Sequence, residues 1–297
     1  MINFKLFVKG AAMGAANVIP GVSGGTVAFI TGIYERLINA LKNVDVEALK
    51  LFFSGRFREF GKKVDFYFLV VLFFGVFVSI ISLAKLLEIL LEQYEVLTLS
   101  FFFGLIVASV LAVSKQVSKL TATVIFSFTI GAAIAIGIAF LPPAQPNESF
   151  MYLILCGVVA VCSMILPGLS GSYILLLMGN YLLVLKAISS LNISILAPIA
   201  IGCIIGLVAL SRILSFLFGR FKDETVATLS GFVAGSLLII WPWKATLTEM
   251  FEGKEKAVGY VWEVPAMNID FLYSSFFIIL GFFIVFWMER KSATVEE

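Results

Sequence analysis

Histidine is absent from this chain of 297 residues, and cysteine occurs only three times. Without histidine there is no Ser-His or Cys-His nucleophile pair, no HExxH zinc site and no attack on phosphate through histidine. The cysteines lie in apolar runs without CxxC spacing, so we expect them to be buried, inert thiols. These absences exclude the common hydrolytic enzymes and leave open an enzyme that works through carboxylates alone.

Charge is scarce as well. Charged residues make up 13% of the sequence, against about 25% in a typical soluble protein. Hydrophobic residues make up 61%, and the mean hydropathy is +1.06. Such a chain cannot cover itself with a polar surface, so lipid must cover part of it. The composition predicts an all-α, multi-pass membrane protein that forms a single membrane domain over residues 1–297.

Six long uncharged runs predict membrane-spanning helices. Each run holds roughly 18 to 25 residues, which suffices to cross a hydrocarbon core of about 30 Å at about 1.5 Å per residue. We expect these spans at about 64–84, 96–114, 120–141, 195–218, 225–243 and 270–288.

Two further apolar segments, at about 5–41 and 149–186, carry a motif that breaks helices. The first contains Pro20-Gly21-Val22-Ser23-Gly24-Gly25-Thr26, and the second contains Pro167-Gly168-Leu169-Ser170-Gly171-Ser172. Inside a membrane, the backbone freed by such a break must be satisfied by protein or by water in a cavity. Each segment is therefore predicted to be a re-entrant hairpin, in which a helix enters, breaks near the midplane and returns. With this arrangement, about three quarters of the 21 Lys and Arg residues fall on one side, which is expected to be the cytoplasm.

The two motifs also belong to an internal repeat. Seven residues of the first half recur in the second half at a constant spacing: Gly10, Pro20, Gly21, Ser23, Gly24, Gly32 and Tyr34 match Gly157, Pro167, Gly168, Ser170, Gly171, Gly179 and Tyr181. A weaker echo relates Thr98-Leu99-Ser100 to Thr228-Leu229-Ser230. We therefore expect two repeats, 1–141 and 142–297, each made of one hairpin and three spans. Three crossings per repeat would invert the second repeat relative to the first, and inverted repeats with broken helices are typical of secondary transporters.

The motifs offer the chemistry of an anion site. Their glycines permit sharp turns, their hydroxyls can cap the returning helix, and the positive end of that helix points inward. The predicted binding residues are Ser23, Gly24, Gly25, Thr26, Ser170, Gly171 and Ser172. Tight packing of small residues and an ion site built from turn carbonyls are the alternatives. No metal site is expected.

Few charges lie within the predicted spans. Lys85 and Arg212 are candidates for the cation that accompanies a bound anion, although either side chain could instead snorkel to the interface. Glu88 lies one helical turn from Lys85 and could neutralise it. Glu35 and Arg36 follow the first hairpin's returning helix, and with Glu88 they are the candidates for gating or coupling.

Two segments outside the spans have membrane-interface character. Lys42–Lys63 mixes phenylalanine and leucine with basic residues, which suits a helix lying on the anionic inner leaflet; a solvated connector is the alternative. Trp241-Pro242-Trp243 is predicted to be an interfacial anchor.

The stretch Met13-Gly14-Ala15-Ala16-Asn17-Val18-Ile19-Pro20-Gly21-Val22-Ser23-Gly24-Gly25-Thr26, followed by Gly32-Ile33-Tyr34-Glu35, resembles a bacterial membrane family. That family was long a domain of unknown function and is now regarded as polyprenyl-phosphate translocases. The second motif, Gly179-Asn180-Tyr181 and Trp241-Pro242-Trp243 are similar to it too, so the resemblance covers nearly the whole chain. Leu166 stands where the family often has phenylalanine. The resemblance implies a non-enzymatic transporter of the bacterial cytoplasmic membrane that returns undecaprenyl phosphate from the outer to the inner leaflet.

The residues by themselves favour an anion transporter, and only the resemblance supplies the lipid. A secondary transporter of a small soluble anion is the main alternative, and a membrane enzyme acting on lipid phosphate is another. We expect no cofactor and no nucleic-acid partner. A coupling proton or cation is a candidate driving partner.

Overall fold

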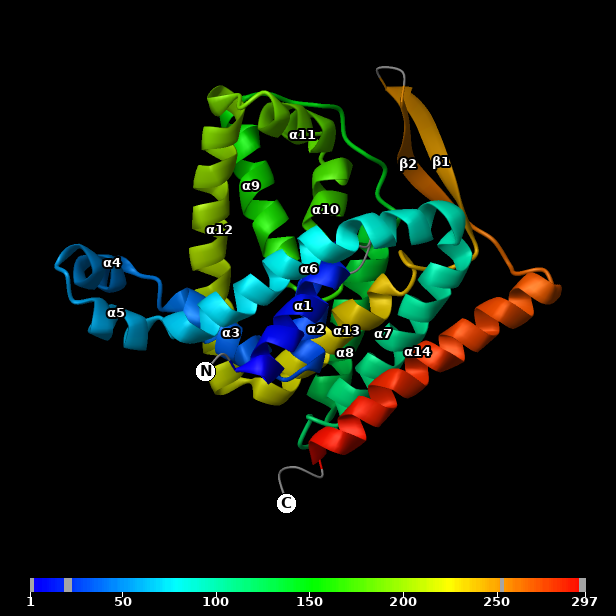
Figure 1. The fold of residues 1–297 in the computed structure, drawn as a ribbon, viewed down its shortest axis with the longest axis horizontal. Coiled ribbons are helices and arrows are strands. Elements are labelled where there is room, and N and C mark those ends of the chain that lie inside the picture. The colour runs from blue at the N-terminus through cyan, green and yellow to red at the C-terminus, as the bar shows by residue number, and fades with distance from the viewer. Residues whose placement is uncertain (1–2, 19–22, 252–253, 294–297) are drawn as a thin grey trace.

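The fold comes from a computed structural model, which describes residues 3–18, 23–251 and 254–293 (Figure 1). The first half of the chain forms helices α1 (Phe4–Val18), α2 (Gly24–Ile30), α3 (Tyr34–Lys42), α4 (Val46–Phe53), α5 (Phe57–Lys63), α6 (Phe66–Gln93), α7 (Glu95–Ser114) and α8 (Ala122–Ala139). The second half forms α9 (Phe150–Ile165), α10 (Gly171–Leu177), α11 (Tyr181–Ser189), α12 (Ile193–Arg220), α13 (Lys222–Ser236), strands β1 (Lys244–Phe251) and β2 (Lys254–Trp262), and α14 (Ile269–Ala293).

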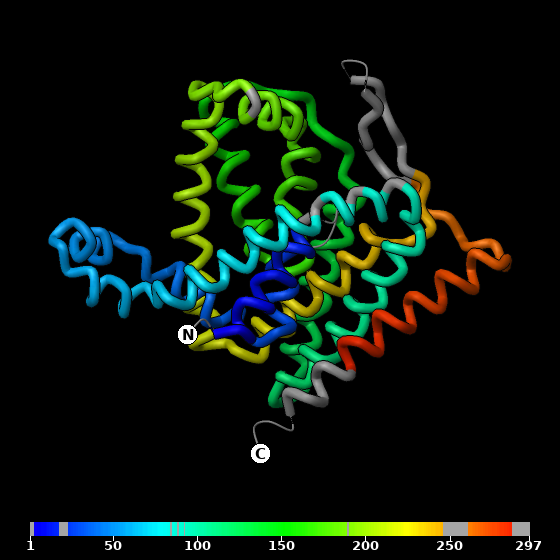
Figure 2. Tube along the Cα trace, in the orientation of Figure 1, coloured from blue at the N-terminus to red at the C-terminus, as the bar shows by residue number. Residues whose placement is uncertain are grey.

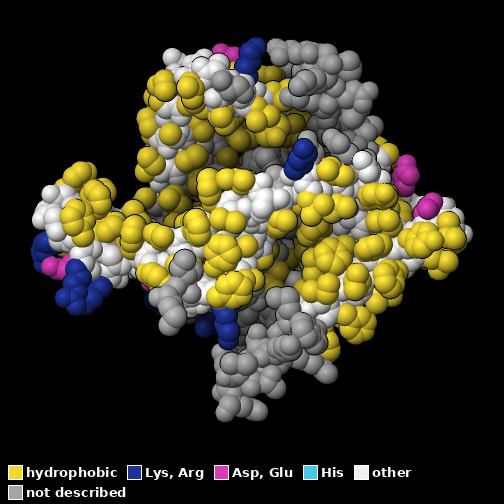
Figure 3. Space-filling view, viewed as in Figure 1, with side chains coloured by type: hydrophobic (Ala, Val, Ile, Leu, Met, Phe, Trp, Pro, Cys, Tyr) yellow, Lys and Arg dark blue, Asp and Glu magenta, His cyan; other side chains and the backbone are white. Residues whose placement is uncertain are grey.

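Five of the described helices are long and apolar enough to cross a membrane. They contain Phe66–Leu83, Glu95–Ser114, Ala122–Ala139, Ile193–Arg220 and Ile269–Phe286. Figure 3 shows hydrophobic side chains spread over the visible face of the molecule, where a soluble protein would carry charge. The structure therefore confirms an all-α polytopic membrane protein, and five of the predicted spans coincide with these helices.

The predicted span at about 225–243 is not among these five helices. The helix there, α13, has only 15 residues, or about 22 Å at 1.5 Å per residue, and hydrogen-bonded turns follow from Leu237 to Ile240. Most of α13 is buried among α7, α8 and α12. Its apolar residues face protein, and an uncharged run that faces protein has the same composition as one that faces lipid.

Both breaking motifs separate helices that pack against each other. α1 packs against α2, and α9 packs against α10, as expected of hairpins. The second break runs from Leu166 to Ser170, whereas Pro20 and Gly21 of the first motif lie outside the described residues. After each returning helix a glycine takes a left-handed conformation, Gly32 with φ +70° and Gly179 with φ +74°, which a side chain would disfavour. At Gly179 the chain bends by 117° from α10 into α11.

The two halves use equivalent glycines to bring helices together. A methyl group on Gly10 would lie 2.1 Å from the carbonyl oxygen of Leu72, and one on Gly157 would lie 2.1 Å from that of Ile199. Gly75 and Gly202 make the reciprocal contacts with α1 and α9. Only glycine allows backbones to approach so closely. The pair α1–α6 is thus packed in the same way as the pair α9–α12.

Two further helix pairs, α7–α14 and α8–α13, are also packed through reciprocal glycine contacts, and each pair joins one helix of the first half to one of the second. Gly104 of α7 lies against the Ile278 carbonyl of α14, and Gly231 of α13 lies against the Phe128 carbonyl of α8. Gly281 and Gly131 make the reciprocal contacts. By these contacts Gly104 corresponds to Gly231. Aligning Thr98-Leu99-Ser100 with Thr228-Leu229-Ser230 would shift this correspondence by three residues, so the weaker sequence match does not mark structurally equivalent positions.

A β-hairpin follows α13. β1 and β2 pair antiparallel, and both are rich in residues that favour strands, such as threonine, valine and tyrosine. Trp262 Nε1 donates to the Leu238 carbonyl at 2.7 Å, and Trp241 Nε1 donates to the Glu263 carbonyl at 3.2 Å. The tryptophans therefore fasten the base of the hairpin to the end of α13.

Candidate functional site

The two breaking motifs touch each other. Thr26 Oγ1 accepts a hydrogen bond from the backbone N–H of Gly168 at 2.8 Å, although 142 residues separate them. Ser23 Oγ donates to the carbonyl oxygen of Met164 at 3.3 Å. Tyr34 Oη donates to that of Ile165 at 3.1 Å. The start of α2 thus packs on the end of α9, so the two motifs meet.

The donors at the start of α2 are occupied in this conformation. The Gly24 N–H donates to Asn17 Oδ1 at 2.7 Å, and the Gly25 N–H donates to Ser23 Oγ at 3.1 Å. Ser23 and Thr26 are 2% and 1% exposed. A methyl group on Gly25 would lie 2.6 Å from the Ile165 carbonyl oxygen, so glycine is needed for the close approach. The first motif acts here as a joint between the halves.

The second motif is more open. The hydroxyls of Ser170 and Ser172 lie 2.9 Å apart, and Ser172 is exposed. Ser170 makes no capping hydrogen bond to α10, in contrast to Ser23 in α2. Met164 stands at the repeat position of Asn17 and covers Gly171 with an apolar side chain. The two copies of the motif therefore offer different polar groups.

Asn17 and Lys9 make contacts that the sequence did not predict, although Asn17 lies in the stretch that carries the family resemblance. Asn17 caps α2 across the break, and its side chain is exposed. Lys9 Nζ donates to the Thr31 carbonyl at 2.6 Å and so caps the other end of α2. α1 therefore holds both ends of α2.

The two intramembrane cations do not join the motifs. Lys85 on α6 and Arg212 on α12 are both exposed. Among the described residues, neither side chain forms a hydrogen bond or an ion pair with the two motifs. Exposure is compatible with snorkelling and with access to a lipid head group. The side chain of Glu88 lies outside the described residues.

Glu35 and Arg36 belong to a set of contacts that joins α3 to the start of α6, to α12 and to the start of α13. Arg36 pairs with Asp65 at 2.6 Å, and Glu35 lies 3.6 Å from Lys222. Further along α3, Asn39 and Lys42 both hydrogen-bond Ser215 of α12. This set joins the hairpin to the predicted cytoplasmic ends of two spans, where a gate would act.

The helices related to α3 and α12 by the repeat are α11 and α6, and these make little contact. Figure 1 shows α11 apart from α6, and Figure 3 shows the surface hollowed between the group α9–α12 and α6. α3 is thus packed against α12, whereas α11 is not packed against α6.

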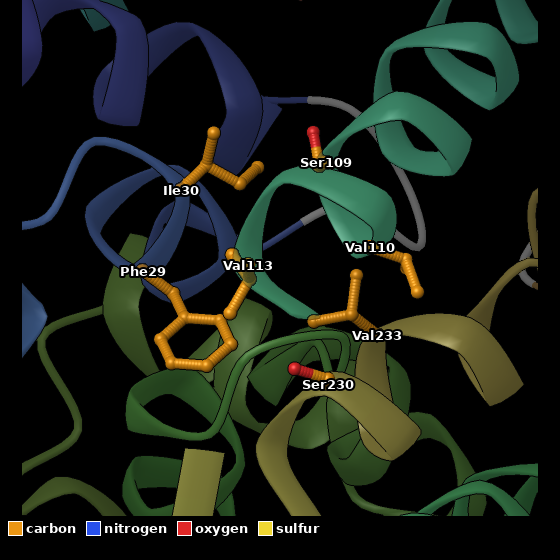
Figure 4. A pocket seen from close by; sticks show the side chains of 7 residues that line it. All are labelled: Phe29, Ile30, Ser109, Val110, Val113, Ser230 and Val233. Carbon is orange, nitrogen blue, oxygen red and sulfur yellow. The ribbon is translucent and has the colours of Figure 1, made fainter. Parts of the chain in front are cut away.

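A small apolar pocket lies beside α2, lined by Phe29, Ile30, Ser109, Val110, Val113, Ser230 and Val233 (Figure 4). Its two hydroxyls donate within their own helices, from Ser109 to the Leu105 carbonyl and from Ser230 to the Val226 carbonyl. This pocket offers no charge for an anion. In the described part of the chain, no group of three or more acidic or cysteine side chains could hold a metal ion.

Residues 13–258 match the family model described as "VCA0040-like: Undecaprenyl phosphate translocase-like". The chain belongs to this family. A polyprenyl-phosphate transporter of Vibrio cholerae is 42% identical over 242 residues, which cover 82% of this chain and 79% of that protein. A polyprenyl-phosphate transporter of Staphylococcus aureus is 31% identical over 253 residues, which cover 79% of this chain and 85% of the Staphylococcus aureus protein. No solved structure matches the chain. Membership confirms the resemblance and is consistent with a multi-pass protein of the bacterial cytoplasmic membrane.

Proposed function

We propose that this protein returns polyprenyl phosphate, with undecaprenyl phosphate as its substrate, from the outer to the inner leaflet of the cytoplasmic membrane. The relatives in Vibrio cholerae and Staphylococcus aureus are named polyprenyl-phosphate transporters, which supports the substrate and a non-enzymatic role. The observation that carries the mechanism is the contact between Thr26 and Gly168, because it joins two helix breaks inside a bundle of spans. A secondary transporter of a small soluble anion is the alternative.

The phosphate is proposed to bind where the motifs meet. The accessible polar groups there are the hydroxyls of Ser170 and Ser172 and the side chain of Asn17. The hydroxyls of Ser23 and Thr26 become available when α2 separates from the end of α9, and the N–H groups of Gly24 and Gly25 exchange their bonds to Asn17 and Ser23 for bonds to phosphate. Gly171 allows close approach of the backbone. Binding would then replace the contact between the motifs with contacts to phosphate.

A full cation should accompany the head group, because an unneutralised phosphate is very costly inside hydrocarbon. Arg212 and Lys85 are proposed for this role, since both are exposed on helices that flank the hairpins. Guanidinium binds phosphate in a bidentate manner, so Arg212→Lys should lose much of the transport although it keeps the charge. A lysine variant as active as the wild type would remove Arg212 from the site.

Movement is proposed to follow from the repeat, with the halves inverted relative to each other. The shared glycine contacts support the relation between the halves, and the unequal packing of α3–α12 and α11–α6 supports two alternative states. In the present state the predicted cytoplasmic end is closed. In the change to the other state, α11 would move against α6 and α3 would separate from α12. This movement would open the site towards the inner leaflet. Glu35 and Arg36 would open their ion pairs in that step, and a proton or cation would couple to it there or at Glu88.

A leaflet-resolved assay in proteoliposomes tests the function. Undecaprenyl phosphate is placed in one leaflet, and its appearance in the other is followed with a phosphatase that cannot cross the membrane. We expect the wild type to equilibrate the lipid and Ser170→Ala/Ser172→Ala to be slower. As a control, added undecaprenol, which lacks the phosphate, should not compete with undecaprenyl phosphate for transport. Transport of inorganic phosphate without movement of the lipid would favour the soluble-anion alternative.

A further inference from the structure

The segment from Asp45 to Lys63 forms an α4–α5 hairpin that stands apart from the rest of the molecule (Figure 2). Gly55, with φ +72°, allows the tight turn between the two helices. Ala48 is the only residue of α4 that is fully buried, and α5 has none. Helices of eight and seven residues are too short to be stable in water by themselves. The α4–α5 hairpin therefore needs contacts with a surface other than the described residues of this chain.

The hairpin carries an aromatic cluster instead of a core. The ring of Phe52 lies 5.4 Å from that of Phe57 and 5.3 Å from that of Phe60. Phe53 is 82% exposed and Phe57 is 61% exposed. This cluster continues into the membrane span, because the Phe60 ring lies 5.9 Å from that of Phe66, the first residue of α6. The apolar surface therefore begins where the lipid-facing surface of α6 begins.

The charges of the hairpin are not balanced. Each of its three acidic side chains is in an ion pair: Asp45 and Glu47 with Lys63, and Glu59 with Arg56. Three basic side chains are exposed and have no ion pair or hydrogen bond within the described residues: Lys50, Arg58 and Lys62. Because Asp45 and Glu47 share Lys63, the hairpin has five basic and three acidic residues and a net charge of +2, and the side chains without an ion pair are all positive.

From this juxtaposition we infer that the α4–α5 hairpin is a docking element for the anionic surface of the membrane from which α6 starts. Exposed phenylalanines enter the boundary between head groups and acyl chains, and the three cations contact anionic lipid phosphates. A soluble protein partner would have to dock on a surface that α6 already holds at the lipid boundary. This inference does not depend on the transported substrate.

Hydrogen–deuterium exchange of the full-length protein in lipid nanodiscs tests the inference. One set of discs holds phosphatidylcholine, and the other also holds phosphatidylglycerol. We expect the backbone amides of residues 47–63 to exchange more slowly in the anionic discs, and high salt to weaken this difference. In Lys50→Gln/Arg58→Gln/Lys62→Gln the ratio of docked to undocked hairpin should fall about 100-fold, since each cation near an anionic surface contributes roughly a factor of five.

Two further variants keep the test specific. Arg56→Gln/Glu59→Gln removes an ion pair of the same hairpin without changing its net charge, and it should keep the difference between the lipids. Phe53→Ser/Phe57→Ser should exchange quickly in both kinds of disc. Equal exchange of the wild type in both lipids, or equal effects of the charge-changing and charge-neutral variants, would overturn the inference. Protection that grows with the number of copies per disc would do so too, and would point to contact between protein chains.

Discussion

Replacing Thr26 by valine is the sharpest perturbation of the contact between the two motifs. Valine has nearly the shape of threonine but cannot accept the hydrogen bond from the Gly168 N–H. Gly168 is buried, so its N–H would be left without a partner. An unsatisfied buried polar group costs about 1–3 kcal/mol. We therefore expect Thr26→Val to destabilise this conformation by that amount, even without lipid.

The measurement is thermal or denaturant unfolding of purified protein in detergent, with and without undecaprenyl phosphate. Thr26→Ser keeps the hydroxyl and should recover most of the lost stability. If the hydroxyl served only to bind phosphate, Thr26→Val would be as stable as the wild type without lipid and would differ only in its presence. That result would refute the assignment of Thr26 as a joint between the halves.

Three other changes have defined outcomes. Gly25→Ala places a methyl group 2.6 Å from the Ile165 carbonyl oxygen and should cost about 1–3 kcal/mol, whereas Gly137→Ala, where nothing lies within 4 Å, should be neutral or slightly stabilising; unfolding compares the two. Burial lowers the pKa of Lys244, on β1 outside the spans, to about 8. The unfolded state therefore holds this proton more tightly than the folded state, which destabilises the wild type below pH 8. Lys244→Met should have a free energy of unfolding higher than that of the wild type at pH 7, by no more than about 3 kcal/mol, and this difference should disappear between pH 8 and 10.5. A difference that does not change with pH would contradict this. Gly10→Ala would collide with the Leu72 carbonyl and should reduce the yield of folded protein far more than Gly219→Ala, which meets nothing within 4 Å; equal yields in detergent extracts would argue against close packing of α1 on α6.

The all-α membrane architecture could be predicted because length and absence of charge limit what a membrane segment can be. The bonds between the two motifs could not, because the pairing of Thr26 with Gly168 depends on how α2 packs on α9. Asn17 is one residue of a quoted motif, and nothing in its spacing marks it as the cap of Gly24. Whether α13 faces lipid or protein could not be predicted, because both surroundings favour the same apolar residues.

In the mechanism that we propose, binding of polyprenyl phosphate separates α3 from α12 and brings α11 against α6. Distances between spin labels test it directly, with one pair at Lys42 and Phe216 and a second pair at Leu185 and Ile89, measured in nanodiscs with undecaprenyl phosphate and with undecaprenol. We expect undecaprenyl phosphate to lengthen the first distance and to shorten the second in the same fraction of molecules, and undecaprenol to change neither distance. Unchanged distances, or two distances that change in the same direction, would contradict it.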